Sequence, residues 1–479
     1  MFLKMFPKFL LSLAVYSVML GVVGDLVTKN VPDPYMDEIF HIPQAQQYCS
    51  GNFSAWDPKI TTLPGLYIFT VGLLEPVHGV ATVLGLDIER SGLCSAGHLR
   101  AVNLVMAVIN AVLLHTLTSH VHGMKENYSD VLGIWSSFNM SFLPVLFMFS
   151  FLYYTDPVST AMVLLTYCLH LSGQNWLAGF AGSLAVLCRQ TNIVWVFLAG
   201  VETAGSLVIS EVRLHQARTK HPPTISLTTG GQLWELGVGI VDLARYPWRL
   251  MRILGLVVLS CGGYLIVGIV FLIFVHLNKG IVVGDRSAHT ATIHLPQLGY
   301  FAAFFTALTL PYAVKNIKDF LVGMKQHYGK VVVVGLLMAI IIEYNTMAHP
   351  YLLADNRHYT FYIWRKVFMR HWVVKFLLIP VYIFGFFHIC KCLAKSELVF
   401  KIVLPICVIL SVVPQMLLEF RYFILPYILI RAQIKPTCWK SLVMETVIVV
   451  FVNIVTLYLF LYKPFLWEQE PENLQRFMW

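Results

Sequence analysis

The sequence predicts an all-α polytopic membrane protein. Of its 479 residues, 57% are hydrophobic and only 12% are charged, and the mean hydropathy is +0.70. A soluble chain of this length carries about a quarter charged residues. The deficit runs along the whole chain, and each apolar window of about 20 residues is long enough to cross a bilayer core. We therefore expect roughly 12–14 transmembrane helices, allowing for short spans.

The expected helices follow one another along the chain, separated by short polar segments. They are 9–28, 98–118, 131–152, 157–173, 177–188, 190–208, 253–276, 298–314, 331–348, 373–392, 400–418, 421–431 and 442–462. Lys4 and Lys8 precede the first one and no clear cleavage site follows it, which indicates an uncleaved signal anchor. The apolar stretch 65–86 is left out because Glu75 interrupts it, and a charge at the bilayer centre is costly. We expect an interfacial or re-entrant helix there, within the first non-cytosolic loop.

Basic residues set the expected orientation. With a cytosolic N-terminus, the connecting segments that carry most Lys and Arg also become cytosolic, as the positive-inside rule requires. These segments are 119–130, 209–252, 315–330, 391–401 and 431–440. The opposite-side segment 29–97 is rich in Asp and Glu, and the same count places the C-terminus on that side. The Lys and Arg residues of the cytosolic segments thus explain the net charge of +9, and we expect no nucleic-acid partner.

Two adjacent carboxylates, Asp37 and Glu38, follow the first expected helix on the non-cytosolic side. Neighbouring carboxylates repel each other, so one of them tends to have a raised pKa and can accept a proton near neutral pH. The pair is therefore a candidate general base at the lipid–water boundary. The alternative is a solvated loop start that only ends the helix.

Further polar groups interrupt apolar stretches on the same side. Asp156 precedes Pro157, where it is either a turn residue or part of a site. Arg189 and Gln190 lie within an apolar run, which is costly unless they line a cavity. An arginine there could bind a phosphate as a planar fork, and a short turn between two helices is the alternative.

Two later loops carry chemistry-bearing residues. Asp285 and Arg286, with His289, form either a sugar or metal site or a loop salt bridge; the spacing does not suit a metal. The segment from Tyr351 to Lys375 is basic, against the positive-inside rule, and interleaved with aromatic residues, which favours a phosphate-bearing lipid headgroup. Its candidate residues are Asp355, Arg357, His358, Tyr359 and Arg365.

Two pairings stay open at this point. Glu419 and Arg421 are typical of an intramembrane ion pair, in which a structural role is at least as frequent as a catalytic one. Cys49 and Cys94 fall in the same expected loop, where they could form a disulfide or remain free thiols.

Long motifs across nearly the whole chain resemble the eukaryotic dolichyl-phosphate-glucose α-1,2-glucosyltransferase family. The segments that carry the resemblance are 35–46, 56–67, 189–192, 284–287, 353–362, 418–426 and 476–479. The resemblance implies a GT-C-type glycosyltransferase of the endoplasmic reticulum membrane whose site faces the lumen. The donor would be dolichyl-phosphate-glucose and the acceptor a dolichyl-diphosphate-linked oligosaccharide, which receives its last glucose with inversion.

The resemblance also implies roles for the candidates. An acid in the first luminal loop acts as the base in such enzymes, which selects Asp37, with Glu38 orienting it or the acceptor; His358 and His289 are alternative bases. Arg357, Arg365 and Arg189 would hold the donor phosphate, so no metal or other cofactor is expected. Three parts would follow: a catalytic module at 1–208, a mobile cytosolic connector at 209–252, and a C-terminal transmembrane module at 253–479.

Two other functions compete with this interpretation. A lipid transporter or scramblase would use the buried charges as a path, although no internal repeat of the kind common in transporters is visible. A non-catalytic membrane partner, such as an ion-channel regulator, would not need Asp37.

Overall fold

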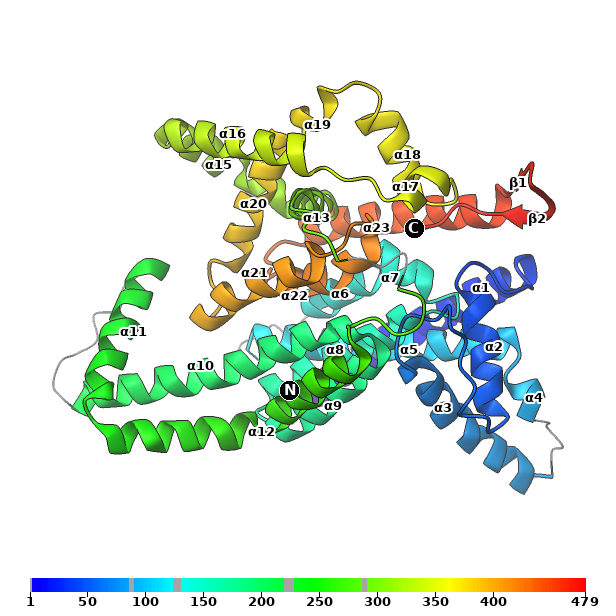
Figure 1. Cartoon of the computed structure of the whole chain (residues 1–479), viewed down its shortest axis with the longest axis horizontal. Coiled ribbons are helices and arrows are strands. Elements are labelled where there is room, and N and C mark those ends of the chain that lie inside the picture. The colour runs from blue at the N-terminus through cyan, green and yellow to red at the C-terminus, as the bar shows by residue number, and fades with distance from the viewer. Residues whose placement is uncertain (1, 86–89, 124–130, 219–227, 287–290) are drawn as a thin grey trace.

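The computed structural model describes residues 2–85, 90–123, 131–218, 228–286 and 291–479, and these residues are almost entirely helical. The helices form an elongated bundle in which α10 and α12 run side by side along the longest axis (Figure 1). The strands of the described residues are β1 and β2, an antiparallel pair close to the C-terminal end of the chain. This confirms the all-α membrane class.

The elements alternate between long helices and short, broken ones. The helices of the first half are α1 (Phe2–Asn30), α2 (Glu38–Cys49), α3 (Gly65–Val83), α4 (Arg90–Leu93), α5 (Ala96–Val121), α6 (Val131–Ser141), α7 (Pro144–Phe149), α8 (Thr155–Leu171), α9 (Asn175–Cys188), η1 (Gln190–Asn192), α10 (Ile193–Arg218) and α11 (Thr229–Ala244). The remaining elements are α12 (Pro247–Asn278), α13 (Pro296–Leu308), α14 (Leu310–Ala313), η2 (Val314–Asn316), α15 (Ile317–Gln326), α16 (Tyr328–Asn345), α17 (Pro350–Ala354), α18 (Tyr359–Ile363), η3 (Trp364–Phe368), α19 (Val374–Leu377), α20 (Ile379–Leu393), α21 (Leu398–Val412), η4 (Phe420–Phe423), α22 (Ile424–Arg431), α23 (Trp439–Tyr462), β1 (Phe465–Trp467) and β2 (Glu470–Gln475).

Fewer helices than expected are long and apolar enough to cross a membrane. Within the described residues there are seven, or eight if the bent pair of α13 with α14–α15 is one span. The expected segment 131–152 shows why a count by helix length gives fewer than the 12–14 expected. It breaks between α6 and α7, and all six residues of α7 are buried inside the protein. Hydropathy reports apolar surroundings, and it cannot distinguish a protein core from lipid.

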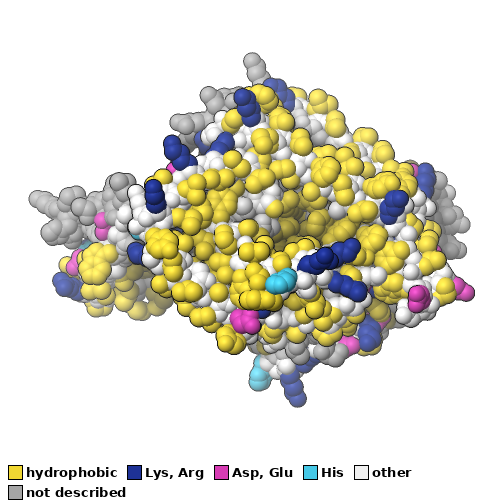
Figure 2. All heavy atoms as spheres, turned by 90° about the horizontal axis from the view of Figure 1, so that it is seen from above, with side chains coloured by type: hydrophobic (Ala, Val, Ile, Leu, Met, Phe, Trp, Pro, Cys, Tyr) yellow, Lys and Arg dark blue, Asp and Glu magenta, His cyan; other side chains and the backbone are white. Residues whose placement is uncertain are grey.

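The outer surface is nonetheless suited to lipid. On the face above α15 to α19, hydrophobic side chains cover most of the surface, and Lys and Arg gather beside a hollow near its centre (Figure 2). The long helices leave much of their apolar surface outside the core: only 22% of the apolar window of α12 is buried. Such an exterior is stable only against acyl chains.

Two contacts between segments that are distant in the sequence hold one end of the bundle together. The first loop is closed by a Cys49–Cys94 disulfide, which settles the pairing left open by the sequence. The N-terminus of α3 lies against the end of α9, where a Cβ on Gly65 would come within 2.5 Å of the Leu187 backbone. Residues 31–37 therefore lie where four helix ends meet: the end of α1, the start of α5, the start of α8 and the end of α9.

The expected mobile connector contains a regular element. Its described part holds α11, which packs against α10 and α12 at the far end of the bundle from α2 (Figure 1). Val212, Leu243 and Ile253 form a small core there. The 209–252 segment is thus ordered at α11 by packing that its sequence did not reveal.

Candidate active site

A strained turn presents Asp37. Met36, just before it, has a positive φ of 55°, which is uncommon for a residue with a side chain. The backbone N–H of Asp37 donates to the Tyr154 hydroxyl at 3.1 Å, and the hydroxyl of Tyr35 contacts the backbone of Arg476. Contacts on both sides hold the turn, which leaves the Asp37 side chain 41% exposed.

Glu38 points the other way and is completely buried. Its carboxylate accepts two hydrogen bonds from Arg100, at 2.8 and 2.6 Å, and others from the backbone N–H groups of Tyr35 and Tyr153. With its oxygens engaged in the protein interior, Glu38 cannot reach an acceptor sugar. The expectation that it orients the acceptor is wrong; it positions the turn that carries Asp37.

Arg421 is the centre of the site. Its Nη1 lies 3.2 Å from Asp37 Oδ2 and 3.9 Å from Asp156 Oδ2, while its Nε and Nη2 donate to Glu419. Arg189 reaches Asp156 from the opposite side, at 2.9 Å. We call Asp37, Asp156, Arg189, Glu419 and Arg421 the charged cluster.

Arg421 also decides the protonation of Asp37. Burial alone would raise the pKa of Asp37, but the charge of Arg421 outweighs it and holds the pKa below the usual aspartate value. Asp37 is therefore a carboxylate at neutral pH, and the raised pKa expected from the carboxylate pair is wrong for this residue. Burial lowers the pKa of nearby His41 to about 4, so its imidazole is neutral.

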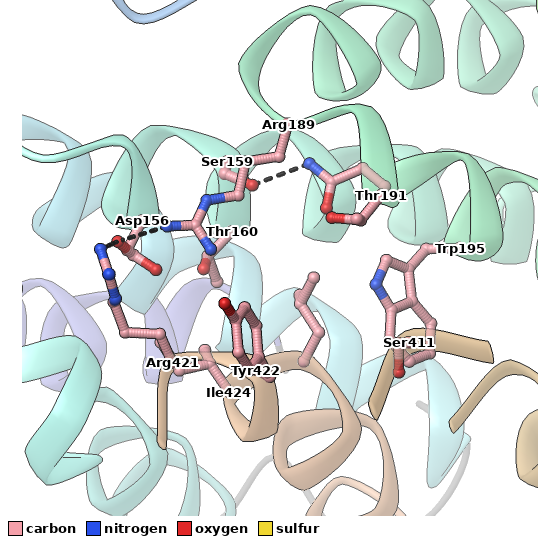
Figure 3. Close-up of a pocket in the computed structure, with 12 residues that line it drawn as sticks. Asp156, Ser159, Thr160, Arg189, Thr191, Trp195, Ser411, Arg421, Tyr422 and Ile424 are labelled. Carbon is pink, nitrogen blue, oxygen red and sulfur yellow. Dashed lines mark hydrogen bonds and ion pairs between the residues drawn. The ribbon is translucent and has the colours of Figure 1, made fainter. Parts of the chain in front are cut away.

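A cavity opens beside the charged cluster. It holds about 430 Å³ of empty space, counting the open solvent at its mouth. Arg189 and Arg421 approach Asp156 from opposite sides at one end of it, and Trp195 and Ser411 lie at the other (Figure 3). Hydroxyl and amide groups complete the lining, from Ser159, Thr160, Thr191, Asn192 and Tyr422. Its wall thus combines charge, neutral hydrogen-bonding groups and an aromatic ring.

The segment 355–359 forms a second group next to this site. Asp355 and Arg357 make a two-point ion pair at 2.9 and 2.7 Å, and Arg357 Nη1 donates to Gln475. His358 Nε2 lies 3.7 Å from Asp355, and its Nδ1 lies 2.9 Å from the Trp479 carbonyl. Both ring nitrogens of His358 thus face protein groups, which makes it a less available base than Asp37.

The segment 476–479 ties this second group to the Asp37 turn. Met478 pairs through its backbone with Arg357 and Tyr359. The guanidinium of Arg476 donates to the carbonyls of Asn30, Phe460 and Leu461, which end α1 and α23. The hydroxyl of Tyr359 has no hydrogen-bond partner among the described residues.

Several candidates lie elsewhere. Asp285 pairs with Lys59 at 3.0 Å on the exposed surface, and Arg286 donates to carbonyls at the end of α12, so the loop salt bridge is the correct alternative there. Gly284 makes this loop possible: its φ is +63°, and a Cβ would lie 2.4 Å from the Ile60 carbonyl oxygen.

Three further candidates complete the comparison. Arg365 is exposed and stacks on Phe361 at 5.7 Å, away from the charged cluster. Gln190 is buried and donates to the Thr61 carbonyl at 3.0 Å, a link to the first loop. His289 lies outside the described residues.

Sequence reasoning missed the partners of Asp37. The sequence suggests Arg421 only as the partner of Glu419, and it does not indicate that the buried Tyr154 contacts Asp37. The 418–426 motif lies close to the 35–46 motif only in the folded protein, so the sequence gives no sign that Arg421 contacts Asp37. No group of three or more His, Cys, Asp or Glu side chains suited to a metal ion occurs among the described residues.

Comparisons with known proteins show the family of this chain. The model of the DIE2/ALG10 family matches residues 31–432, which include the whole charged cluster. A human Dol-P-Glc:Glc(2)Man(9)GlcNAc(2)-PP-Dol alpha-1,2-glucosyltransferase is 39% identical over 458 residues, covering 94% of each chain. Proteins of the same name from Drosophila melanogaster and Arabidopsis thaliana are 33% and 32% identical over 460 and 504 residues, covering 95% of this chain and 95% and 96% of theirs. No solved structure matches. The charged cluster thus lies in a member of the DIE2/ALG10 family, to which this chain belongs.

Proposed function

We propose that this protein is an inverting glucosyltransferase that moves glucose from dolichyl-phosphate-glucose to a diglucosylated, dolichyl-diphosphate-linked oligosaccharide in α-1,2 linkage. The names of the relatives support the donor, the acceptor and the linkage. The observation that carries the proposal within the chain is the accessible Asp37 carboxylate, 3.2 Å from Arg421, a residue that lines a polar cavity. A GT-C-type arrangement accords with this placement of the base after the first membrane helix.

Asp37 is the proposed general base. The acceptor hydroxyl oxygen attacks the anomeric carbon of glucose, and the new C–O bond forms as the bond from that carbon to the phosphate oxygen breaks. The hydroxyl proton passes to Asp37, and the electron pair of the broken bond leaves with the lipid phosphate. A base already ionised at neutral pH can accept this proton without first losing one.

Arg189 is the better-supported phosphate-binding group. Its Nε and Nη2 bind Thr155 and Asp156, and its Nη1 has no partner among the described residues. Arg357, by contrast, is occupied by Asp355 and Gln475 and lies over the Trp467 ring at 4.6 Å. We therefore assign the leaving phosphate to Arg189, with Arg421 contributing its charge and Arg357 holding the 355–359 segment.

Guanidinium groups can stabilise a phosphate leaving group by themselves, so we propose that the reaction needs no metal ion. Activity that survives exhaustive treatment with a chelator is the expected result. Activity lost to the chelator and restored by a divalent metal would contradict it.

The location follows from the same proposal. A dolichol-linked donor and acceptor require the endoplasmic reticulum membrane, with the charged cluster in the lumen and the N-terminus in the cytosol. The segment 476–479 contacts the Asp37 turn, so it lies on the same side as the site.

The test is a transfer assay with purified protein in a lipid bilayer. Dolichyl-phosphate-glucose and the diglucosylated lipid-linked acceptor are supplied, and the released glycan is analysed by mass. The expected product is heavier by one hexose, which an α-glucosidase removes. Intact protein that gives no heavier product, although both substrates remain intact, would refute the proposal, and a mannosyl donor is the specificity control.

A further inference from the structure

Helix α11 leaves large apolar side chains exposed on the side away from α10 and α12. Its side toward α10 and α12 holds Asp242, which binds His215 at 2.9 Å, and the buried Leu243. Its opposite side is apolar and open, with Trp234 76% and Val241 64% exposed. Leu233, Val238 and Ile240 are the other exposed large apolar side chains of α11. We call this set the α11 outer face.

The α11 outer face continues into a surface that faces lipid. The start of α12 exposes Trp248, Met251 and Leu254, and α12 is one of the helices long and apolar enough to cross a membrane. In Figure 1, α11 crosses the ends of α10 and α12 at a steep angle instead of continuing along them. A helix so placed runs along the plane of a bilayer that α12 crosses.

Arginines mark the level of the headgroups. At about 1.5 Å per residue, the helix from Arg252 to Asn278 is about 39 Å long, whereas the hydrocarbon core is about 30 Å thick. Arg252 and the exposed Arg245 therefore lie near one edge of that core. Asp242 binds His215 at 2.9 Å and lies 3.7 Å from Arg245, so it offsets part of the Arg245 charge, whereas Glu235 is half-buried.

We propose that α11 is a membrane-surface helix that binds anionic lipid on the leaflet opposite Asp37. Its outer face enters the boundary between headgroups and acyl chains, and Arg245 and Arg252 bind lipid phosphates. A bilayer is the partner that fits, because it already covers the adjoining surface of α12. This binding surface is separate from the charged cluster and does not depend on the reaction catalysed there.

Collision measurements on a spin label test the position of α11. The full-length protein, with Cys390, Cys392 and Cys438 replaced by serine, carries one nitroxide at Val238 in bilayers of phosphatidylcholine with or without phosphatidylserine. A label at Leu272, an exposed residue in the apolar part of α12, is the lipid reference, and a label at exposed Asn473 is the water reference. We expect oxygen to collide with the Val238 label more often than a nickel chelate does, as at Leu272.

Other outcomes overturn the proposal. A Val238 label as accessible to nickel as the one at Asn473 would place the outer face in water. A label shielded from both reagents would show that protein, such as a second copy of the chain, covers it.

The headgroup contact has its own test. Phosphatidylserine should move the Val238 label deeper, and the double variant Arg245→Gln/Arg252→Gln should abolish that shift. Arg370→Gln, at an exposed arginine after η3, is the matched control and should keep the shift. A shift that persists in the double variant would refute phosphate binding by these arginines.

Discussion

Arg421 and Arg431, on either side of α22, both bind carboxylates, but their surroundings differ. Arg431 binds Glu445 at 2.6 and 2.7 Å, and the two side chains are 0% and 1% exposed. Tyr312 and Asn139 also donate to Glu445, so this pair is closed. Arg421 is 18% exposed, and its partner Asp37 is 41% exposed.

The difference separates a structural ion pair from a candidate site. A closed pair has exchanged water for protein donors on every side, so a substrate has nothing to displace. The charged cluster keeps carboxylate surface open beside a cavity, so a substrate hydroxyl or phosphate can reach it. Both pairs consist of an arginine and a carboxylate, and only their degree of enclosure sets them apart.

The largest effect should come from removing the proposed base. Asp37→Asn keeps the size of the side chain but cannot take a proton, so kcat should fall by about 10²- to 10⁴-fold. The amount of folded protein should not change, because the side chain is partly exposed. The transfer assay measures this, and Asp285→Asn, another carboxylate paired with a cation, is the control that should keep activity.

Removing one partner of the buried Arg431–Glu445 pair should reduce stability instead of activity. Glu445→Leu leaves the Arg431 charge buried without its partner, which should destabilise the protein by about 3–5 kcal/mol. The double change Arg431→Leu/Glu445→Leu should recover much of this loss. Thermal unfolding in detergent measures the stability of both variants. If Glu445→Leu were as stable as wild type, Glu445 would not be the buried partner that neutralises Arg431.

Neutralising Arg421 should alter the pH dependence of the reaction. Arg421 holds the pKa of Asp37 down, so in Arg421→Gln that pKa rises and the base is protonated up to a higher pH. The acid limb of the kcat/KM profile should therefore move to higher pH. At neutral pH, kcat/KM should fall roughly ten- to a hundredfold, as for the loss of a charge-assisted hydrogen bond. An unshifted acid limb would mean that Asp37 is not the titrating base.

The smallest effect is expected at Arg365. Its side chain is exposed and stacks on the Phe361 ring. Arg365→Gln should therefore change kcat/KM by about twofold or less. The matched variant is Arg189→Gln, which removes a guanidinium of the charged cluster and should raise the donor KM. A large loss of kcat/KM in Arg365→Gln would show that Arg365 takes part in donor binding.

Several site features could be predicted from local sequence. Asp37 is a candidate because a carboxylate after a membrane helix is costly without a purpose, and Arg189 is a candidate because it interrupts an apolar run. Glu38 shows the limit of such reasoning. Adjacent residues at the start of a helix point in different directions, and only the buried Arg100 shows which of the two carboxylates faces inward.

Composition and hydropathy by themselves determined that this is an all-α membrane protein with an acidic first loop, because those properties depend on neighbouring residues only. The tertiary structure alone decided which carboxylate is open, how many apolar segments are long enough to cross a membrane, and what surrounds the cavity. Asp37 and Arg421 are 384 residues apart, yet they share a hydrogen bond. A contact of that kind depends on how the helices pack, and packing brings together residues whose separation in the sequence says nothing about their distance in space.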